Sequence, residues 1–168
     1  MSGEAFTIWT VRLATLLYVA ALAIWLTANS LRGWQLARLT WTAAFLCYVA
    51  HVYGAFEFVH GWNHTAAYVE TARQTDELFG LAWGGGIFFN YAFTILWLAD
   101  AIWWWSDPEG HRRRPRSITG AIHGFLAFMF FNGAVVFGSG PVRWFGIAAV
   151  PTLLWLWWRS RRVGSALV

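Results

Sequence analysis

The residues best suited to chemistry in this sequence are a glutamate and two histidines. Glu57, His60 and His64 stand at i, i+3 and i+7, so an uninterrupted helix would place all three on one face. A carboxylate and two imidazoles on one face can bind iron, zinc, copper or another divalent transition metal and leave coordination positions open. The spacing therefore predicts a site for a single metal ion, with ligand distances of about 2.0–2.2 Å.

Three alternatives to this metal site remain open. The Glu-x-x-His spacing also occurs in di-iron helix bundles, but those need a second such motif, which the chain lacks. The same side chains can instead form a hydrogen-bonded polar cluster without metal. A histidine pair such as His51 and His123 can ligate haem b, although a rise of about 1.5 Å per residue places the two at different depths and disfavours haem.

The composition is typical of an integral membrane protein. With 58% hydrophobic and only 12% charged residues among 168, the chain is too apolar for a soluble domain of this size. Holding a charge in hydrocarbon costs roughly 2.5–3.5 kcal/mol on insertion scales, so the clustering of Glu57 with histidines indicates a function. The sequence has no lysine, which excludes a retinal Schiff base, and its single cysteine, Cys47, excludes a thiolate metal site within one chain.

Five apolar segments are long enough to cross a bilayer, for which roughly 20 residues suffice. They predict an all-α bundle with transmembrane helices at about residues 7–28, 39–59, 81–105, 118–137 and 142–158. We expect residues 1–168 to form a single polytopic membrane domain. The first segment is too long for a signal-peptide core and lacks a basic region before it, so we expect it to stay as a membrane anchor.

The arginines predict the orientation. Nine of the twelve basic residues follow the first, third or fifth span, namely Arg32, Arg38, Arg112, Arg113, Arg114, Arg116, Arg159, Arg161 and Arg162. Because basic loops face the cytoplasm, we expect the N-terminus outside and the C-terminus inside, in a bacterial cell (inner) membrane. Topology explains these basic runs, so we expect lipid rather than nucleic acid as the partner. Association with other membrane subunits, or with a second copy of the chain, stays open.

The long connector between the second and third spans predicts a short amphipathic helix on the outer membrane surface, at about residues 64–79. Asn63 is a suitable N-cap, and Glu70, Arg73 and Glu77 are spaced for ion pairs on one side. The other side carries a polar stripe of His64, Tyr68, Thr71 and Thr75. We expect this stripe to face the bundle, with the helix covering it like a lid.

Five further residues are candidates for supporting the metal site or relaying protons. His51 shares a face with Gly54, where another helix can approach, so it is expected either to bond to that helix or to serve haem or proton transfer. Asp100 lies at about the depth of His123, and a buried carboxylate must be paired or neutral, so a contact between the two is predicted. The full set is His51, Tyr68, Asn90, Asp100 and His123.

Taken together, these patterns predict a membrane metalloprotein, oxidoreductase-like, whose site lies at the outer face of the bundle. The alternatives are a non-catalytic accessory or scaffolding subunit of a larger membrane complex and a small haem-b-binding membrane protein. A nucleotide-dependent activity has no support, because the glycines at 84–86 are not followed by the Lys-Ser or Lys-Thr of a phosphate-binding loop. We expect these glycines to allow close packing of helices.

Overall fold

The computed structural model describes residues 2–165, with side chains described to residue 160, and all regular structure in this part is helical. This confirms the predicted all-α class. The elements are α1 (Gly3–Thr27), α2 (Leu31–Ala55), the π-helical η1 (Phe56–His60), α3 (His64–Phe79), α4 (Gly86–Ser106), α5 (Pro108–Arg113), α6 (Arg116–Phe131), the π-helical η2 (Asn132–Val136) and α7 (Gly140–Ser165).

Four helical stretches of the described chain are long and apolar enough to cross a membrane. They are Gly3–Thr27, Leu31–His60, Gly86–Ser106 and Arg116–Val136, and they cover the first four predicted spans. The fifth predicted span lies in α7, which has sufficient length but is less apolar than these helices. Four spans are therefore supported by length and composition together, and α7 by length alone.

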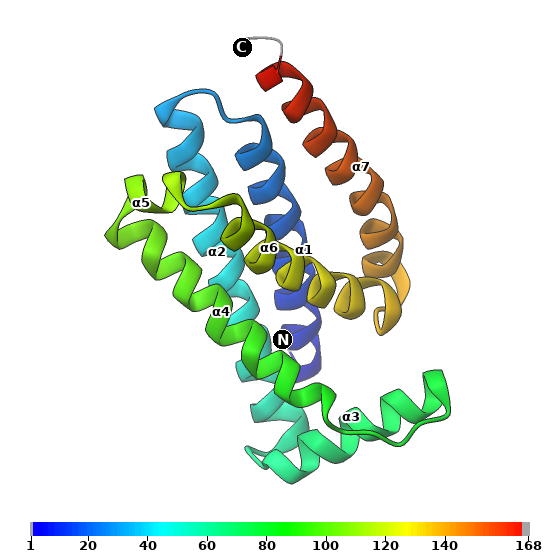
Figure 1. The fold of residues 1–168 in the computed structure, drawn as a ribbon. Coiled ribbons are helices and arrows are strands. Elements are labelled where there is room, and N and C mark those ends of the chain that lie inside the picture. The colour runs from blue at the N-terminus through cyan, green and yellow to red at the C-terminus, as the bar shows by residue number, and fades with distance from the viewer. Residues whose placement is uncertain (1, 166–168) are drawn as a thin grey trace.

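The helices form a bundle with one helix lying across its end. α1 and α2 run antiparallel and pack along most of their length, α4 packs on α2 and α6, and α7 packs on α1 and η2 (Figure 1). α3 lies across the end of the bundle opposite α5 and contacts η1 and α4 (Figure 1). The bundle thus has an α3 end and an α5 end, which differ in chemistry.

Local capping explains why two helices begin earlier than their apolar runs indicate. Ser2 accepts a hydrogen bond from the amide of Ala5 at 3.3 Å, and Ser30 accepts one from Gly33 at 3.2 Å. Such caps satisfy amide groups that the first helical turn leaves without partners. α2 consequently starts at Leu31 rather than near residue 39, because hydropathy marks the hydrocarbon layer and not the end of the helix.

The third long helix begins later than predicted, at Gly86 instead of near residue 81. The residues before it form a connector that packs against α3. A Cβ atom at Gly84 would lie 2.4 Å from the carbonyl oxygen of Tyr68, so only glycine fits there. Of the three glycines expected to serve close packing, Gly84 does so against α3.

Aromatic side chains make up the centre of the bundle. Tyr18, Trp41 and Trp97, from α1, α2 and α4, are each at most 2% exposed. The Tyr18 ring stacks on Phe130 of α6 at 4.7 Å and lies 5.5 Å and 5.4 Å from the rings of Trp41 and Trp97. Because these large rings interlock four helices, they fix the positions of the polar groups above and below them.

α3 has the bounds that the sequence predicts, His64–Phe79. The Oδ1 atom of Asn63 accepts hydrogen bonds from the amides of Thr65 and Ala66 at 2.8 Å and 3.3 Å, and Gly80 ends the helix with φ = 66°. Thr75 of the polar stripe is buried, and Arg73 forms ion pairs with acidic residues on the other side. His64 and Tyr68 of the same stripe are exposed, so the predicted division into a stripe facing the bundle and a charged side is confirmed only in part.

Candidate functional site

The predicted metal ligands do not share one helix. η1 ends at His60, and the next two residues, Gly61 and Trp62, both have φ = 56°. A positive φ is uncommon for any residue other than glycine and turns the chain sharply. His64 therefore begins a new helix in a new direction, and the expectation of a helix continuing from Glu57 to His64 is wrong.

Each of the three predicted ligands has a separate contact. Glu57 Oε2 accepts a hydrogen bond from Trp62 Nε1 at 2.7 Å, and His64 Nδ1 lies 2.9 Å from the hydroxyl of Tyr91. The His60 ring packs edge-on against Phe56 at 5.6 Å. Among residues 2–165, no group of three or more His, Cys, Asp and Glu side chains is placed to hold a metal ion. Binding of iron, zinc or copper here stays a prediction that these contacts do not support.

The α3 end instead contains a cavity of about 740 Å³, bounded by residues of α1, α2, η1, α3, α4, α6, η2 and α7. Cavities of about 300–1,000 Å³ are typical of small-molecule sites. Most of the lining is apolar or aromatic, and its most buried members are Tyr18 and Trp97 of the aromatic core. Further wall residues are Val52, Ala55, Phe56, Phe89, Phe93, Met129 and Phe130.

His51 contributes a hydrogen-bond acceptor to this cavity. Its Nδ1 atom lies 2.9 Å from the carbonyl oxygen of Thr7, and since a carbonyl only accepts, Nδ1 carries the proton and Nε2 keeps a lone pair. The hydrogen bond to a neighbouring helix that the sequence predicts for His51 is confirmed. The helices touch closely beside it, because a Cβ at Gly54 would lie 2.7 Å from Thr7 Oγ1.

The α3 side of the cavity carries a carboxylate and several uncharged polar groups. Glu70 lines the cavity, and a hydrogen bond from Arg73 lowers its pKa to about 2, so the group is ionised at neutral pH. Gln74 Nε2 donates to the same carboxylate at 2.8 Å. Other polar lining residues are His60, Thr71, Thr75, Asn90, Tyr91 and Asn132. Of the predicted supporting residues, the structure thus places His51 and Asn90 at the cavity.

Tyr68 lies outside this lining. Its ring and backbone carbonyl pack against the connector at Gly84, and it is 37% exposed. It therefore holds α3 against the chain before α4 and does not touch a site formed with Glu57 or His60. The supporting role predicted for Tyr68 beside a metal centre stays a prediction that this contact does not support.

A second polar cluster lies at the α5 end. Arg114 donates to Asp100 Oδ1 and, through its other terminal nitrogen, to His123 Nε2 at 2.8 Å. His111 Nε2 is 3.3 Å from the same carboxylate oxygen, and its ring stacks on Trp104 at 4.5 Å. Asp100, His111 and Arg114 are 2%, 3% and 8% exposed. The predicted direct contact between Asp100 and His123 is corrected, because Arg114 stands between them.

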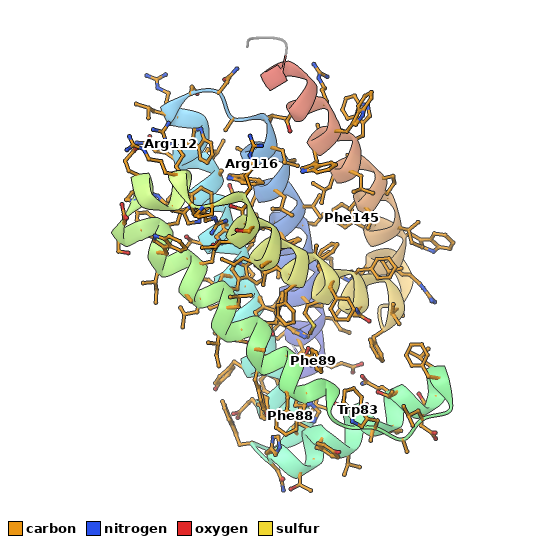
Figure 2. All side chains as sticks on the ribbon, in the orientation of Figure 1. Trp83, Phe88, Phe89, Arg112, Arg116 and Phe145 are labelled. Atoms are coloured by element: carbon orange, nitrogen blue, oxygen red, sulfur yellow. The ribbon has the colours of Figure 1, made fainter. Side chains whose placement is uncertain are left out.

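The contacts of His111 and Arg114 with Asp100 were not predicted from the sequence, because the basic run at 111–116 was assigned to membrane topology alone. The short helix α5, capped by Asp107, turns the chain back so that residues 111 and 114 reach Asp100. The signal was the buried carboxylate itself, since it requires a cation nearby. Figure 2 shows Arg112 and Arg116 of the same run at this end of the bundle, and Trp83, Phe88 and Phe89 near α3.

The two polar regions are separated by the aromatic core. His123 packs against Trp25 at 4.9 Å and Trp41 at 5.6 Å, and Trp41 lies 5.1 Å from Trp97, which lines the cavity. The His51 and His123 rings therefore lie on opposite sides of this core. This arrangement agrees with the sequence argument against a haem held by both.

Neither a protein-family model nor a curated protein nor a solved structure matches this chain.

Proposed function

We propose that this protein binds a small, largely apolar and uncharged molecule that it takes from the lipid bilayer. The observation that carries the proposal is the cavity of about 740 Å³ at the α3 end, with aromatic and aliphatic walls and a few polar groups. Such a lining suits a ligand whose affinity comes from apolar contact and whose orientation comes from one or two hydrogen bonds.

The charges around the cavity favour an uncharged ligand. The ionised carboxylate of Glu70 lines it and repels an anionic head group, whereas the nearby guanidinium of Arg73 is engaged by both Glu70 and Glu77. The remaining polar lining groups are amides, hydroxyls and imidazoles. Free fatty acids and anionic phospholipids are thus poorer matches than neutral amphiphiles.

The same proposal places the chain in the membrane with five spans, α7 being the fifth. The arginine-rich α5 end would face the cytoplasm of a bacterial cell and α3 would lie on the outer surface. Two arginine–tryptophan contacts support an interfacial belt at the α5 end: Arg38 lies 4.1 Å from the Trp105 ring and Arg159 lies 5.4 Å from Trp155. A reporter fused after Val168 should report the cytoplasm, and one inserted near Thr71 the outside.

Analysis of co-purified small molecules tests the binding proposal. The protein is purified in mild detergent, extracted with organic solvent, and the extract is analysed by mass spectrometry. We expect a neutral compound at near-stoichiometric yield. In Gly133→Leu, which adds a side chain at a cavity-lining glycine with nothing within 4 Å of its Cβ, the yield should fall about tenfold.

Gly124→Leu is the matched control, because Gly124 also has nothing within 4 Å of its Cβ but does not line the cavity. Equal yields from Gly133→Leu and Gly124→Leu would contradict the proposal. So would the absence of any specifically retained neutral compound from the unaltered protein.

A further inference from the structure

We propose that the ligand is a planar aromatic carbonyl compound of the quinone type, and that the hydroxyl of Tyr18 and the indole N–H of Trp97 bind its carbonyl oxygen. This inference rests on the proposed function, because it concerns the occupant of the same cavity. It names the chemical class of the ligand and the two side chains that select it.

The first observation is a pair of unsatisfied donors. The Tyr18 hydroxyl and Trp97 Nε1 are buried and have no hydrogen-bond partner, and both residues line the cavity. Native proteins pair the large majority of their buried polar groups, so two adjacent exceptions at one cavity indicate a partner from outside the chain. An indole only donates, so that partner must accept.

The second observation is the shape of the aromatic wall. The rings of Tyr18 and Phe130 are stacked with their planes 17° apart, and those of Tyr48 and Trp97 with their planes 25° apart. All four residues line the cavity. The stacked rings cover one another, but a wall built from aromatic rings still suits a planar conjugated ligand, which can pack against their edges and outer faces.

The cavity wall at this point can yield to a ligand. Met129 lines the cavity and also packs against the core that contains Tyr18 and Trp97. Because the two donor atoms are themselves buried, a carbonyl oxygen reaches them only if a wall side chain moves, and an unbranched thioether adapts readily to a neighbour. At the α3 side, Asn90 offers an amide for a second polar group of the same ligand.

Other occupants fit these observations less well. A lipid acyl chain would fill the apolar volume but has no acceptor for the two donors. A fatty acid has an acceptor, but its charge is disfavoured by the ionised carboxylate of Glu70. A neutral carbonyl group on a flat apolar ring meets both requirements.

The test compares two probes with the purified full-length protein in detergent or nanodiscs. The first is a 1,4-naphthoquinone with one isoprenoid unit, and the second is the naphthalene hydrocarbon with the same tail and no carbonyl groups. Binding is measured by quenching of the intrinsic fluorescence, which 14 tryptophans provide, and by the increase in Tm. We expect the quinone to bind at least about tenfold more tightly, the effect of one well-formed hydrogen bond.

Tyr18→Phe keeps the ring, so it should weaken binding of the quinone about tenfold and leave binding of the hydrocarbon unchanged; Trp97→Phe also reduces the aromatic wall, so it should weaken binding of the quinone about tenfold more than binding of the hydrocarbon. Trp41→Phe is the matched control. Trp41 is equally buried and its Nε1 is also without a partner, but it does not line the cavity. That variant should bind both probes as the unaltered protein does.

The outcomes separate this inference from the proposed function. If quinone and hydrocarbon bind equally and Gly133→Leu weakens both, the cavity binds apolar molecules but the carbonyl inference is overturned. If Tyr18→Phe, Trp97→Phe and Trp41→Phe bind the quinone alike, the two donors have no role in recognition and the inference fails as well. If no neutral compound binds at all, the proposed function fails with it.

Discussion

The two ends of this bundle differ in what their polar groups do. At the α5 end, one carboxylate oxygen of Asp100 contacts Arg114 and His111, and Arg114 also contacts His123, while Asp100 Oδ2 and the Nδ1 atoms of both histidines are buried without a partner. At the α3 end, polar side chains line a cavity, and most of them, such as His51, Thr71 and Gln74, have partners within the chain. The α5 end thus holds helices together through a buried ion pair, whereas the α3 end encloses space for a ligand.

The aromatic core makes this division possible. It provides an apolar layer between a buried ion pair and a cavity, so that neither region needs to supply partners for the other. Among the buried unpartnered donors, Tyr18 and Trp97 face the cavity side of this layer, and Trp41 connects it to His123. The four predictions that follow test this contrast between the α5 end, with its buried ion pair, and the α3 end, with its cavity.

The largest effect is expected at the α5 end. Arg114→Met removes the cation from a buried carboxylate, and we expect the free energy of unfolding to fall by about 3–5 kcal/mol. Denaturation of the purified protein in mixed micelles measures the change. Arg113→Met is the control: Arg113 is 78% exposed and pairs only with Glu109, so its loss should change stability by at most about 1 kcal/mol. Similar losses in both variants would remove the contrast between buried and exposed charge.

The next effect concerns the contact between α1 and α2 beside the cavity. Gly54→Ala places a Cβ 2.7 Å from Thr7 Oγ1, which forces the helices apart, and we expect a destabilisation of about 1–3 kcal/mol. Gly120→Ala, where nothing lies within 4 Å, should be neutral or slightly stabilising. The two variants are compared by the same denaturation assay. A neutral Gly54→Ala would mean that the walls of the cavity are looser than the structure shows.

A smaller and local effect is expected in α3. Asn63→Ala removes the side-chain oxygen that caps this helix, at a cost of about 1 kcal/mol. Hydrogen exchange should then accelerate in residues 64–79, while exchange around Asp100 stays as it was. Acceleration at both ends would indicate that α3 and the α5 end unfold as one unit.

The smallest effect depends on pH and also concerns α3. The pKa of Glu70 falls from 4.5 to about 2, first through its hydrogen bond from Arg73, so the carboxylate is more acidic in the folded chain. The contribution of the ionised Glu70 carboxylate to the stability of α3 is therefore fully present above about pH 4.5 and is lost as the pH falls toward 2. Exchange in α3, corrected for intrinsic rates, should accelerate over this range. Glu70→Gln should show no such dependence, and an unchanged profile in that variant would contradict the assignment.

Local patterns in the sequence were sufficient to identify the long helices and α3, but not α5. Four apolar runs identified four helices that can span a membrane, and the bounds of α3 followed from Asn63 and a polar stripe. The positions of caps such as Ser30 were missed where apolar length alone set the boundary. The apolar runs and the cap at Asn63 involve only residues within one or two helical turns of each other, which is why a single sequence reveals them.

The predicted geometry of the metal site was wrong for a local reason, and the sequence itself contains that reason. Glycine directly after His60, followed two residues later by Asn63, is a typical helix stop and new N-cap. The prediction continued the helical spacing across that stop and so placed His64 on the same face as Glu57 and His60. Partners such as Arg114, by contrast, reach Asp100 only through the fold of α5, and no periodicity in the sequence encodes that contact.

The two π-helical segments have a consequence for how this protein can change over evolutionary time. Phe56–His60 and Asn132–Val136 both line the cavity, and each is wound with one residue more per turn than its flanking α-helix. The wider turn absorbs the extra residue, because about five π-helical residues turn the chain through roughly the same angle as four α-helical ones. Deleting one residue from either segment would thus restore α-helical winding and change the cavity wall locally, while the helix that follows keeps its orientation.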